Sequence, residues 1–359
     1  MKVAIVYDRV NKWGGAERVL LALHEIFPEA PLYTSVYDSM NAPWAKAFPV
    51  VVTSFLQKFP FAKSNHELFA SLMPLAFESF DFSGFDLVIS VTSEAAKGVR
   101  TKPGTLHICY CLTPTRYLWS HHDEYFKGKV FKAFAKPFID RLRKWDKIAA
   151  KRPDKIIAIS TEVKNRIKKY YDRESDVIFP PVNTSMIRTN RVNGRKHYLV
   201  VSRLVKYKKV DLAVKAFNKL GYPLTIIGTG RVERKLKKMA GKNIKFAGQV
   251  SENDLTMYYR GAKALIMPQE EDFGIVAVEA QSFGVPVIAY KKGGVLDTII
   301  PEKTGVFFDE QNPESLIHAV KKFEKIKFDE KELKTNADRF SKERFKKEFI
   351  DFVKNARMF

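Results

Sequence analysis

The chain has 359 residues and carries 62 Lys or Arg against 40 Asp or Glu, a formal net charge of +22. This length exceeds what one ordinary hydrophobic core accommodates, so it predicts two domains. The sequence has no apolar run long enough for a transmembrane helix, no internal repeat and no low-complexity tract. A membrane-spanning protein, a repeat solenoid and a disordered tail are therefore not expected.

The first residues and the cysteines indicate a cytoplasmic protein. Met1 and Lys2 lead directly into an apolar run at residues 3–7, which predicts a strand rather than a signal peptide. Cys109 and Cys111 are two positions apart on a predicted strand, so they share a face. Extended backbone between them places them poorly for a disulfide, and unpaired cysteines are typical of a reducing compartment.

The excess of positive charge predicts attraction to polyanions. Nucleic acid, anionic lipid and phosphorylated substrates all meet this requirement, and charge alone does not select among them. A nucleic-acid-binding protein would carry aromatic–basic sheet motifs or a helix-turn-helix pattern. Neither pattern is found in the sequence, so a nucleic-acid partner is the alternative and not the expectation.

Short apolar runs predict strands that alternate with helices along the chain. The expected strands are residues 3–7, 85–91, 106–111, 155–160, 197–201, 224–230, 244–250, 264–267 and 285–290. The expected helices are residues 16–27, 126–152, 277–283, 312–323 and 341–356, with others starting after Ser160 or Thr161 and at Val232. This alternation predicts the α/β class with two doubly wound domains.

A proline pair and a polar run mark the expected domain boundary. Pro180 and Pro181 are followed by a run of Asn, Thr, Arg and Gly, which is typical of an interdomain linker. We place the boundary near Ser185, so the two expected domains span residues 1–185 and 186–340.

Two adjacent glycines, Gly14 and Gly15, lie at the start of the first expected helix. Glycines at a helix start let a ligand approach the backbone N–H groups closely. A plain turn accounts for the pair equally well, and the dinucleotide pattern Gly-x-Gly-x-x-Gly is absent. By itself the pair does not decide between a ligand contact and a turn.

Two segments combine aromatic and basic residues. Residues 55–82 hold phenylalanines at irregular spacing with interspersed lysines, and residues 126–152 hold ten cations among aromatic residues. Such segments suit an anionic membrane surface, where each cation contributes about 1 kcal/mol. For residues 55–82 the alternative is a helical core segment under a loop, and for residues 126–152 it is an aromatic core stripe under a solvated lysine face. Pro137 is expected to kink or break the second segment.

A pair of cations follows the strand expected at residues 197–201. The loop begins at Ser202 and carries Arg203 and Lys208, five positions apart. A planar guanidinium and a point-charge ammonium at the carboxyl end of a strand suit a diphosphate. Two solvated surface cations are the alternative in so basic a chain.

An acidic loop connects the strand expected at residues 264–267 to the helix expected at 277–283. Glu271 lies in the loop and Glu279 on the helix, so the two carboxylates can contact different parts of one ligand. Ligands bind at the carboxyl ends of strands in open α/β sheets, where helix starts offer free N–H groups. Without His or Cys nearby, the carboxylates suit sugar hydroxyls better than a metal.

The stretch from Glu271 to Glu279 resembles the donor-site signature of the family-four retaining glycosyltransferases, Glu-x7-Glu with Phe-Gly two places after the first Glu. In that family the first Glu and nearby backbone amides hold the donor sugar, and the second Glu holds the nucleotide ribose. The resemblance implies further donor contacts from Asp272, Phe273, Gly274 and Ile275. The commoner family loop has Gly where Asp272 stands, and Asp is similar to the bacterial O-antigen mannosyltransferase branch.

The same resemblance implies roles for the other loops. Arg203 and Lys208 would neutralise the diphosphate, and the glycine loop from Gly14 would face the donor phosphates and the acceptor. The loops that approach the nucleotide would contribute Ser202, Gly228, Gln249 and Val250.

The segment from Cys111 to Trp119 resembles the Cys-His-Thr-Pro-x-Arg-Tyr-x-Trp signature of that branch. Arg116 and Tyr117 match it and would lie on the acceptor side. Leu112 departs from it, because the family carries a His there, near the 6-hydroxyl of the donor hexose. Leucine cannot form that hydrogen bond, and whether one of three nearby histidines replaces it is left open: His107, His121 and His122.

Taken over nearly the whole chain, the resemblance implies the GT-B fold. Two Rossmann-like domains would face each other across a cleft, with a C-terminal helix at 341–359 crossing back to the N-terminal domain. The implied activity is retaining transfer of a sugar from GDP-mannose or a UDP-sugar to a glycan or lipid-linked acceptor in cell-surface polysaccharide or glycolipid synthesis. We expect no metal and no cofactor, and a peripheral position on the inner face of the membrane. A nucleotide-sugar epimerase on the same fold is the alternative enzyme.

Overall fold

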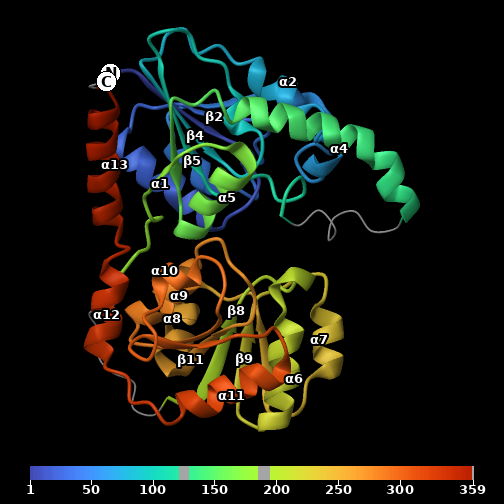
Figure 1. Ribbon diagram of the computed structural model, residues 1–359, viewed down its shortest axis with the longest axis vertical. Coiled ribbons are helices and arrows are strands. Elements are labelled where there is room, and N and C mark those ends of the chain that lie inside the picture. The colour runs from blue at the N-terminus through green and yellow to red at the C-terminus, as the bar shows by residue number, and fades with distance from the viewer. Residues whose placement is uncertain (121–128, 185–194, 358–359) are drawn as a thin grey trace. The chain divides into compact units, whose positions relative to one another are not determined.

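The computed structural model describes residues 1–120, 129–184 and 195–357. The chain divides into two compact units, an N-terminal unit of Met1–Pro181 with Phe345–Phe359 and a C-terminal unit of Val182–Arg344. Each unit has a parallel sheet and helices of its own (Figure 1). Ser185, where the boundary was predicted, lies outside the described residues.

The N-terminal unit is built on a seven-stranded parallel sheet of order β3-β2-β1-β4-β5-β6-β7. Its strands are β1 Val3–Tyr7, β2 Leu32–Thr34, β3 Val51–Thr53, β4 Leu87–Thr92, β5 Leu106–Cys111, β6 Lys155–Ala158 and β7 Asp176–Val177. Its described α-helices are α1 Gly15–Ile26, α2 Met73–Glu78, α4 Lys129–Ala149, α5 Thr161–Tyr171 and most of α13 Lys342–Arg357. β1 and β4 are buried at every position, as expected for parallel strands covered on both faces.

The C-terminal unit has a six-stranded parallel sheet of order β10-β9-β8-β11-β12-β13. Its strands are β8 His197–Val201, β9 Leu224–Ile227, β10 Ile244–Gly248, β11 Ala262–Met267, β12 Val287–Tyr290 and β13 Gly305–Phe308. Its described α-helices are α6 Val210–Leu220, α7 Glu233–Met239, α8 Glu252–Gly261, α9 Ile275–Ser282, α10 Val295–Thr298, α11 Pro313–Phe323 and α12 Glu330–Asp338. The strand order is that of the doubly wound dinucleotide-binding folds, so the predicted class is confirmed.

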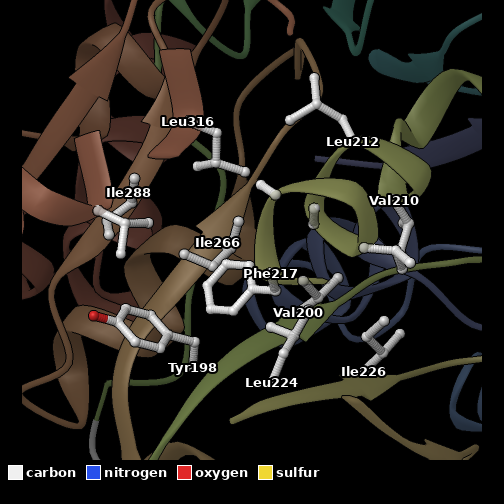
Figure 2. Close-up of a cluster of buried hydrophobic side chains, with 14 of the residues drawn as sticks. Tyr198, Val200, Val210, Leu212, Phe217, Leu224, Ile226, Ile266, Ile288 and Leu316 are labelled. Carbon is white, nitrogen blue, oxygen red and sulfur yellow. The ribbon is translucent and has the colours of Figure 1, made fainter. Parts of the chain in front are cut away.

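Side chains from strands and helices fill the core of the C-terminal unit (Figure 2). Phe217 of α6 packs against Tyr198 of β8, with ring centroids 5.0 Å apart. Ile266 of β11 and Ile288 of β12 belong to the same buried cluster. This core holds β8 and β11 side by side, and the candidate site lies at the ends of these two strands.

The last helix belongs mainly to the N-terminal unit. Phe345 and Phe349 of α13 are fully buried, and their rings lie 5.8 and 6.4 Å from that of Tyr110 on β5. Arg357 donates to the Met1 sulfur at 3.0 Å, so both ends of the chain lie together, as Figure 1 shows. The packing of α13 against β5 therefore attaches the C-terminal end of the chain to the N-terminal unit.

Several elements differ from the sequence expectations. Strands β2, β3, β7 and β13 and helices α6, α8, α10 and α12 were not expected. β2, β3 and β7 have at most three residues, too few for a clear apolar run. A kink or a break was expected at Pro137, and α4 continues through this residue without a break. Proline removes one hydrogen bond from a helix, and in α4 the buried Ile139 and Leu142 anchor the helix beyond it.

Candidate functional site

The strand order of the C-terminal unit reverses direction between β8 and β11. These adjacent strands are parallel, so the loops that follow them emerge at the same edge of the sheet. The first loop carries Arg203 and Lys208, and the second carries Glu271. Ligands of open α/β sheets bind in the crevice at such a switch point. The sheet therefore brings together the cations and the carboxylate that the sequence singled out.

Arg203 and Lys208 both lie close to one aromatic ring in the loop after β8. The Arg203 guanidinium lies 6.0 Å and the Lys208 ammonium 5.4 Å from the centre of the Tyr207 ring. Arg203 also donates a hydrogen bond of 2.5 Å from Nη2 to the Tyr207 hydroxyl. A cation within about 6 Å of a ring centre is attracted by the negative face of the ring. Tyr207 was missed in the sequence, where an aromatic residue between cations is not a distinctive signal.

Lys208 and Glu271 form an ion pair across the two loops. Lys208 donates from Nζ to Oε1 of Glu271, and the side chains are 13% and 15% exposed. Gln269 donates from Nε2 to the same oxygen at 2.7 Å. Desolvated charges are stable only when paired. Glu271 is therefore held by one charged and one neutral donor at the edge of the sheet.

The backbone of the Glu271 loop fits tightly against a glycine pair after β12. Gly294 donates from its N–H to the Glu271 carbonyl at 2.8 Å. Gly293 has φ +83°, and a Cβ atom there would lie 2.3 Å from that carbonyl oxygen. Both glycines were missed as site residues. The detectable signal is a Gly-Gly pair that begins three positions after the end of a buried strand.

The loops after β9 and β10 adjoin the same edge. A Cβ atom on Gly228, which has φ +122°, would lie 2.0 Å from the Ser202 carbonyl oxygen. Gly228 donates to the Gly248 carbonyl at 2.7 Å, directly before Gln249. Gln249 is exposed and Val250 packs partly into the core. The structure thus places the four predicted nucleotide-side residues on neighbouring loops.

Helix α9 carries Glu279 and begins immediately after Gly274. Gly274 has φ +93°, a conformation that favours glycine, and Ile275 is the first helical residue. Tyr259 of α8 donates a hydrogen bond of 2.9 Å to Oε2 of Glu279. The Tyr259 ring is buried and stacked on that of Phe283, 5.2 Å away. Glu279 is therefore oriented by a rigid tyrosine that the sequence analysis missed.

Not every residue of the acidic loop offers its side chain to a ligand. Phe273 is only 3% exposed, and its ring lies 5.5 Å from that of Phe340. Only its backbone can serve the predicted donor contact. Asp272 is half-buried in the same loop.

In the N-terminal unit the corresponding switch point lies between β1 and β4. Asp8, after β1, is 2% exposed and accepts four backbone N–H bonds of 2.7–3.0 Å from residues 93–96. Gly14 caps α1 without a side-chain bond and Gly15 is exposed. Asp8 therefore holds the loop after β4 in place beside the loop that carries the glycine pair.

The segment after β5 is held by a buried carboxylate on α4. Asp146 accepts hydrogen bonds from Thr115 at 3.0 Å and Trp119 at 2.7 Å, and pairs with the buried Lys97 at 2.6 Å. Thr115 and Trp119 bracket Arg116 and Tyr117, the two residues predicted to face the acceptor. Asp146 was missed, because its partners lie far from it in the sequence.

Leu112 is half-buried at the end of β5, and its N–H bonds the Thr92 carbonyl at 2.8 Å. Of the three histidines considered as replacements for the family His, His121 and His122 lie outside the described residues. His107 is fully buried within β5 and shares a 2.8 Å hydrogen bond with Ser90. Burial, with nearby Arg152, lowers the pKa of His107 to about 3. His107 therefore does not act as a partner beyond the strand end.

In each of the two aromatic–basic segments, some side chains are buried in the core and others are exposed. Phe77 and Phe82 are buried in the core of the N-terminal unit, as the alternative predicted. Phe55, Phe59 and Phe61 are instead 37%, 42% and 71% exposed. On the described part of α4, exposed cations lie beside exposed apolar residues at helical spacing. They are Phe138, Arg141, Lys144 and Ile148.

Residues 1–120, 129–184 and 195–357 contain no cluster of three or more His, Cys, Asp or Glu side chains that could hold a metal ion. No helix in these ranges is both long enough and apolar enough to cross a membrane.

Two family models match the chain and cover most of it. Residues 13–186 match the model for Glycosyltransferase Family 4, and residues 183–340 match the model for Glycosyl transferases group 1. The chain therefore carries both domains of a family-four glycosyltransferase. The glycosyltransferase family predicted from the Glu271 and Glu279 stretch is thus confirmed, while the retaining mechanism and the O-antigen mannosyltransferase branch stay predictions.

The matched part of this family-four chain spans about half the length of the curated relatives that it resembles. An uncharacterised glycosyltransferase of Methanocaldococcus jannaschii is 29% identical over 176 residues, 47% of this chain and 49% of the relative. A GDP-mannose-dependent alpha-(1-6)-phosphatidylinositol monomannoside mannosyltransferase of Mycobacterium tuberculosis is 30% identical over 159 residues, 39% and 41% of the two chains.

Solved structures confirm the GT-B fold of this family-four chain. A lipopolysaccharide outer core galactosyltransferase matches with a TM-score of 0.70 at 18% identity, over 99% of both chains. The Anabaena protein HepE in complex with UDP-glucose matches with a TM-score of 0.72 at 15% identity, over 99% of this chain and 100% of that one.

Proposed function

We propose that this chain transfers a sugar from a nucleotide-diphosphate donor to a glycan or lipid-linked acceptor, with retention of anomeric configuration. The observation that carries the proposal is the contact between Lys208 and Glu271 at the switch point. It joins a cation suited to a diphosphate to a carboxylate suited to sugar hydroxyls. One donor molecule carries both groups next to each other.

Within this proposal Arg203 and Lys208 stabilise the charge that grows on the leaving diphosphate. Fixed cations placed where charge develops are among the largest contributions to catalysis. Glu271 orients the sugar, and Glu279, oriented by Tyr259, accepts from the ribose hydroxyls. With two cations supplied by the chain, we expect transfer to continue without a divalent metal.

The donor is proposed to be GDP-mannose or a UDP-sugar. A mannosyltransferase relative is described as GDP-mannose-dependent, and one structural neighbour was solved with UDP-glucose. These descriptions concern those proteins and guide the choice of donors to test. The proposed acceptor is a cell-surface glycan precursor or glycolipid, reached by peripheral docking on the anionic inner face of the membrane.

The test is nucleotide release from a panel of GDP- and UDP-sugars, with and without a membrane lipid extract and in the presence of EDTA. We expect release from one donor that increases with acceptor and is unaffected by EDTA. NMR of the product should show the anomeric configuration of the donor retained. Release that never depends on an acceptor would instead favour the nucleotide-sugar epimerase.

A further inference from the structure

A buried glutamine beside the candidate site donates a hydrogen bond, although an apolar side chain of the same size would fill its position. Gln269 follows β11 and is only 2% exposed. It donates from Nε2 to Oε1 of Glu271 at 2.7 Å, the oxygen that Lys208 also contacts. Among the described residues, none donates a hydrogen bond to Oε2 of Glu271. Both donors therefore fix one carboxylate oxygen and leave the other for a ligand.

The orientation of the Gln269 amide follows from chemistry. Turning it over would bring its carbonyl oxygen against Glu271 Oε1, acceptor against acceptor. In the observed orientation its own Oε1 is buried and has no hydrogen-bond partner within the described residues. An unpaired buried carbonyl oxygen lowers stability. Methionine would fill the same space without that cost, so packing does not explain the amide.

We propose that Gln269 is a positioning residue that holds the Glu271 carboxylate for the donor sugar. The inference rests on the proposed function, in which Lys208 also serves the diphosphate. An ammonium shared between a carboxylate and a diphosphate holds each more weakly than it would hold one alone. The Gln269 amide carries no charge, so the diphosphate does not compete for it as it competes for Lys208. It therefore keeps Glu271 in place while donor is bound.

The structure offers a matched control. Gln311 donates from Nε2 to the Pro268 carbonyl at 2.9 Å, one residue before Gln269. Gln311→Met removes an equivalent amide donor and disturbs the same strand end without touching Glu271. Gln269→Met removes the donor to Glu271 at similar volume. Gln269→Glu replaces the donor by a carboxyl group that can donate only when protonated.

The experiment measures nucleotide release and the donor KM with GDP-mannose and UDP-glucose between pH 5 and pH 8. We expect Gln269→Met to raise the donor KM about tenfold at every pH, the effect of one hydrogen bond to a charged group. Gln311→Met should stay near wild type. Gln269→Glu should be worst at pH 8 and approach wild type toward pH 5, because two adjacent carboxylates share a proton at low pH.

A second measurement does not need a substrate. The melting temperatures of Gln269→Met, Glu271→Ala and the double variant form a double-mutant cycle. If the hydrogen bond holds Glu271, the double variant loses less than the sum of the single losses. Gln311→Met with Glu271→Ala should be additive.

The possible outcomes separate the two claims. An active wild-type protein with additive melting shifts, or with Gln269→Glu impaired equally at all pH values, overturns the role of Gln269 alone. A wild-type protein that releases no nucleotide from any donor of the panel overturns the proposed function and this inference with it.

Discussion

Arg203 and Lys208 come from one loop but have different surroundings. Arg203 is exposed and contacts Tyr207, whereas Lys208 is 13% exposed and paired with Glu271. If both stabilise the leaving diphosphate, Arg203→Ala and Lys208→Ala should each lower turnover about a hundredfold with the fold intact. The measurement is steady-state nucleotide release, with circular dichroism to confirm folding.

The control for this prediction lies in the same loop. Lys206 is exposed and has no assigned role, so Lys206→Ala removes the same charge from the loop. We expect it to keep nearly full turnover. Equal losses in all three variants would mean that the loop acts only through its overall charge, and the diphosphate assignment would then be wrong.

Leu112 bears on donor choice. A donor hydroxyl facing leucine where the family has His would lose a hydrogen bond, at a cost of about 1–3 kcal/mol. We therefore expect a 6-deoxy sugar or a pentose donor to be tolerated or preferred over the matching hexose. Competition between GDP-mannose and its 6-deoxy counterpart tests this. A preference for the hexose that Leu112→His leaves unchanged would contradict it.

At the scale of elements, loop-to-loop backbone contacts shape the site. Gly293 combines φ +83° with a Cβ position 2.3 Å from the Glu271 carbonyl oxygen. Gly221 has φ +73° but open space around its Cβ position. Gly221→Ala should cost about 1–2 kcal/mol for backbone strain alone. Gly293→Ala should cost more, since the Glu271 loop must move, and it alone should weaken donor binding.

Chemical denaturation and donor titration together measure these effects. Denaturation midpoints give the free-energy losses, and donor binding reports the position of the Glu271 loop. If both variants lost the same stability and bound donor equally well, the tight contact between the glycine pair and the Glu271 loop would have no functional consequence.

At the scale of the molecule, the charge of +22 and the exposed aromatic residues of the N-terminal unit predict membrane docking. Vesicles with phosphatidylglycerol should bind the protein, and binding should fall steeply as salt shortens the Debye length below about 10 Å. Co-sedimentation at rising salt measures this. Binding that is equal on neutral vesicles, or insensitive to salt, would count against it.

Two variants distinguish docking through the N-terminal unit from a general effect of exposed apolar side chains. Phe61 in the N-terminal unit is 71% exposed, and Met257 in the C-terminal unit is 59% exposed. Phe61→Ser should reduce vesicle binding, because the ring would lose its contact with the lipid interface. Met257→Ser should leave it unchanged. Equal effects would place the lipid contact elsewhere.

The sequence by itself determined the α/β class, most strands and the loops that carry the candidate residues. The expected bounds of β5 and β8 agree with those observed, because buried parallel strands require continuous apolar runs that are visible locally. Ser160 was one of two expected caps for α5, and it accepts the Val163 N–H at 3.1 Å. Capping and apolar periodicity act over a few residues, so local sequence encodes them.

Only the tertiary structure decided which of these loops meet. Lys208 and Glu271 are 63 positions apart, and they touch because β8 and β11 are neighbours in the sheet. Tyr259 is likewise 20 positions from Glu279 and was found only through the packing of α8 against α9. The order of the strands depends on how helices pack on both faces of the sheet. It is therefore set by packing throughout the unit, and no local sequence pattern indicates it.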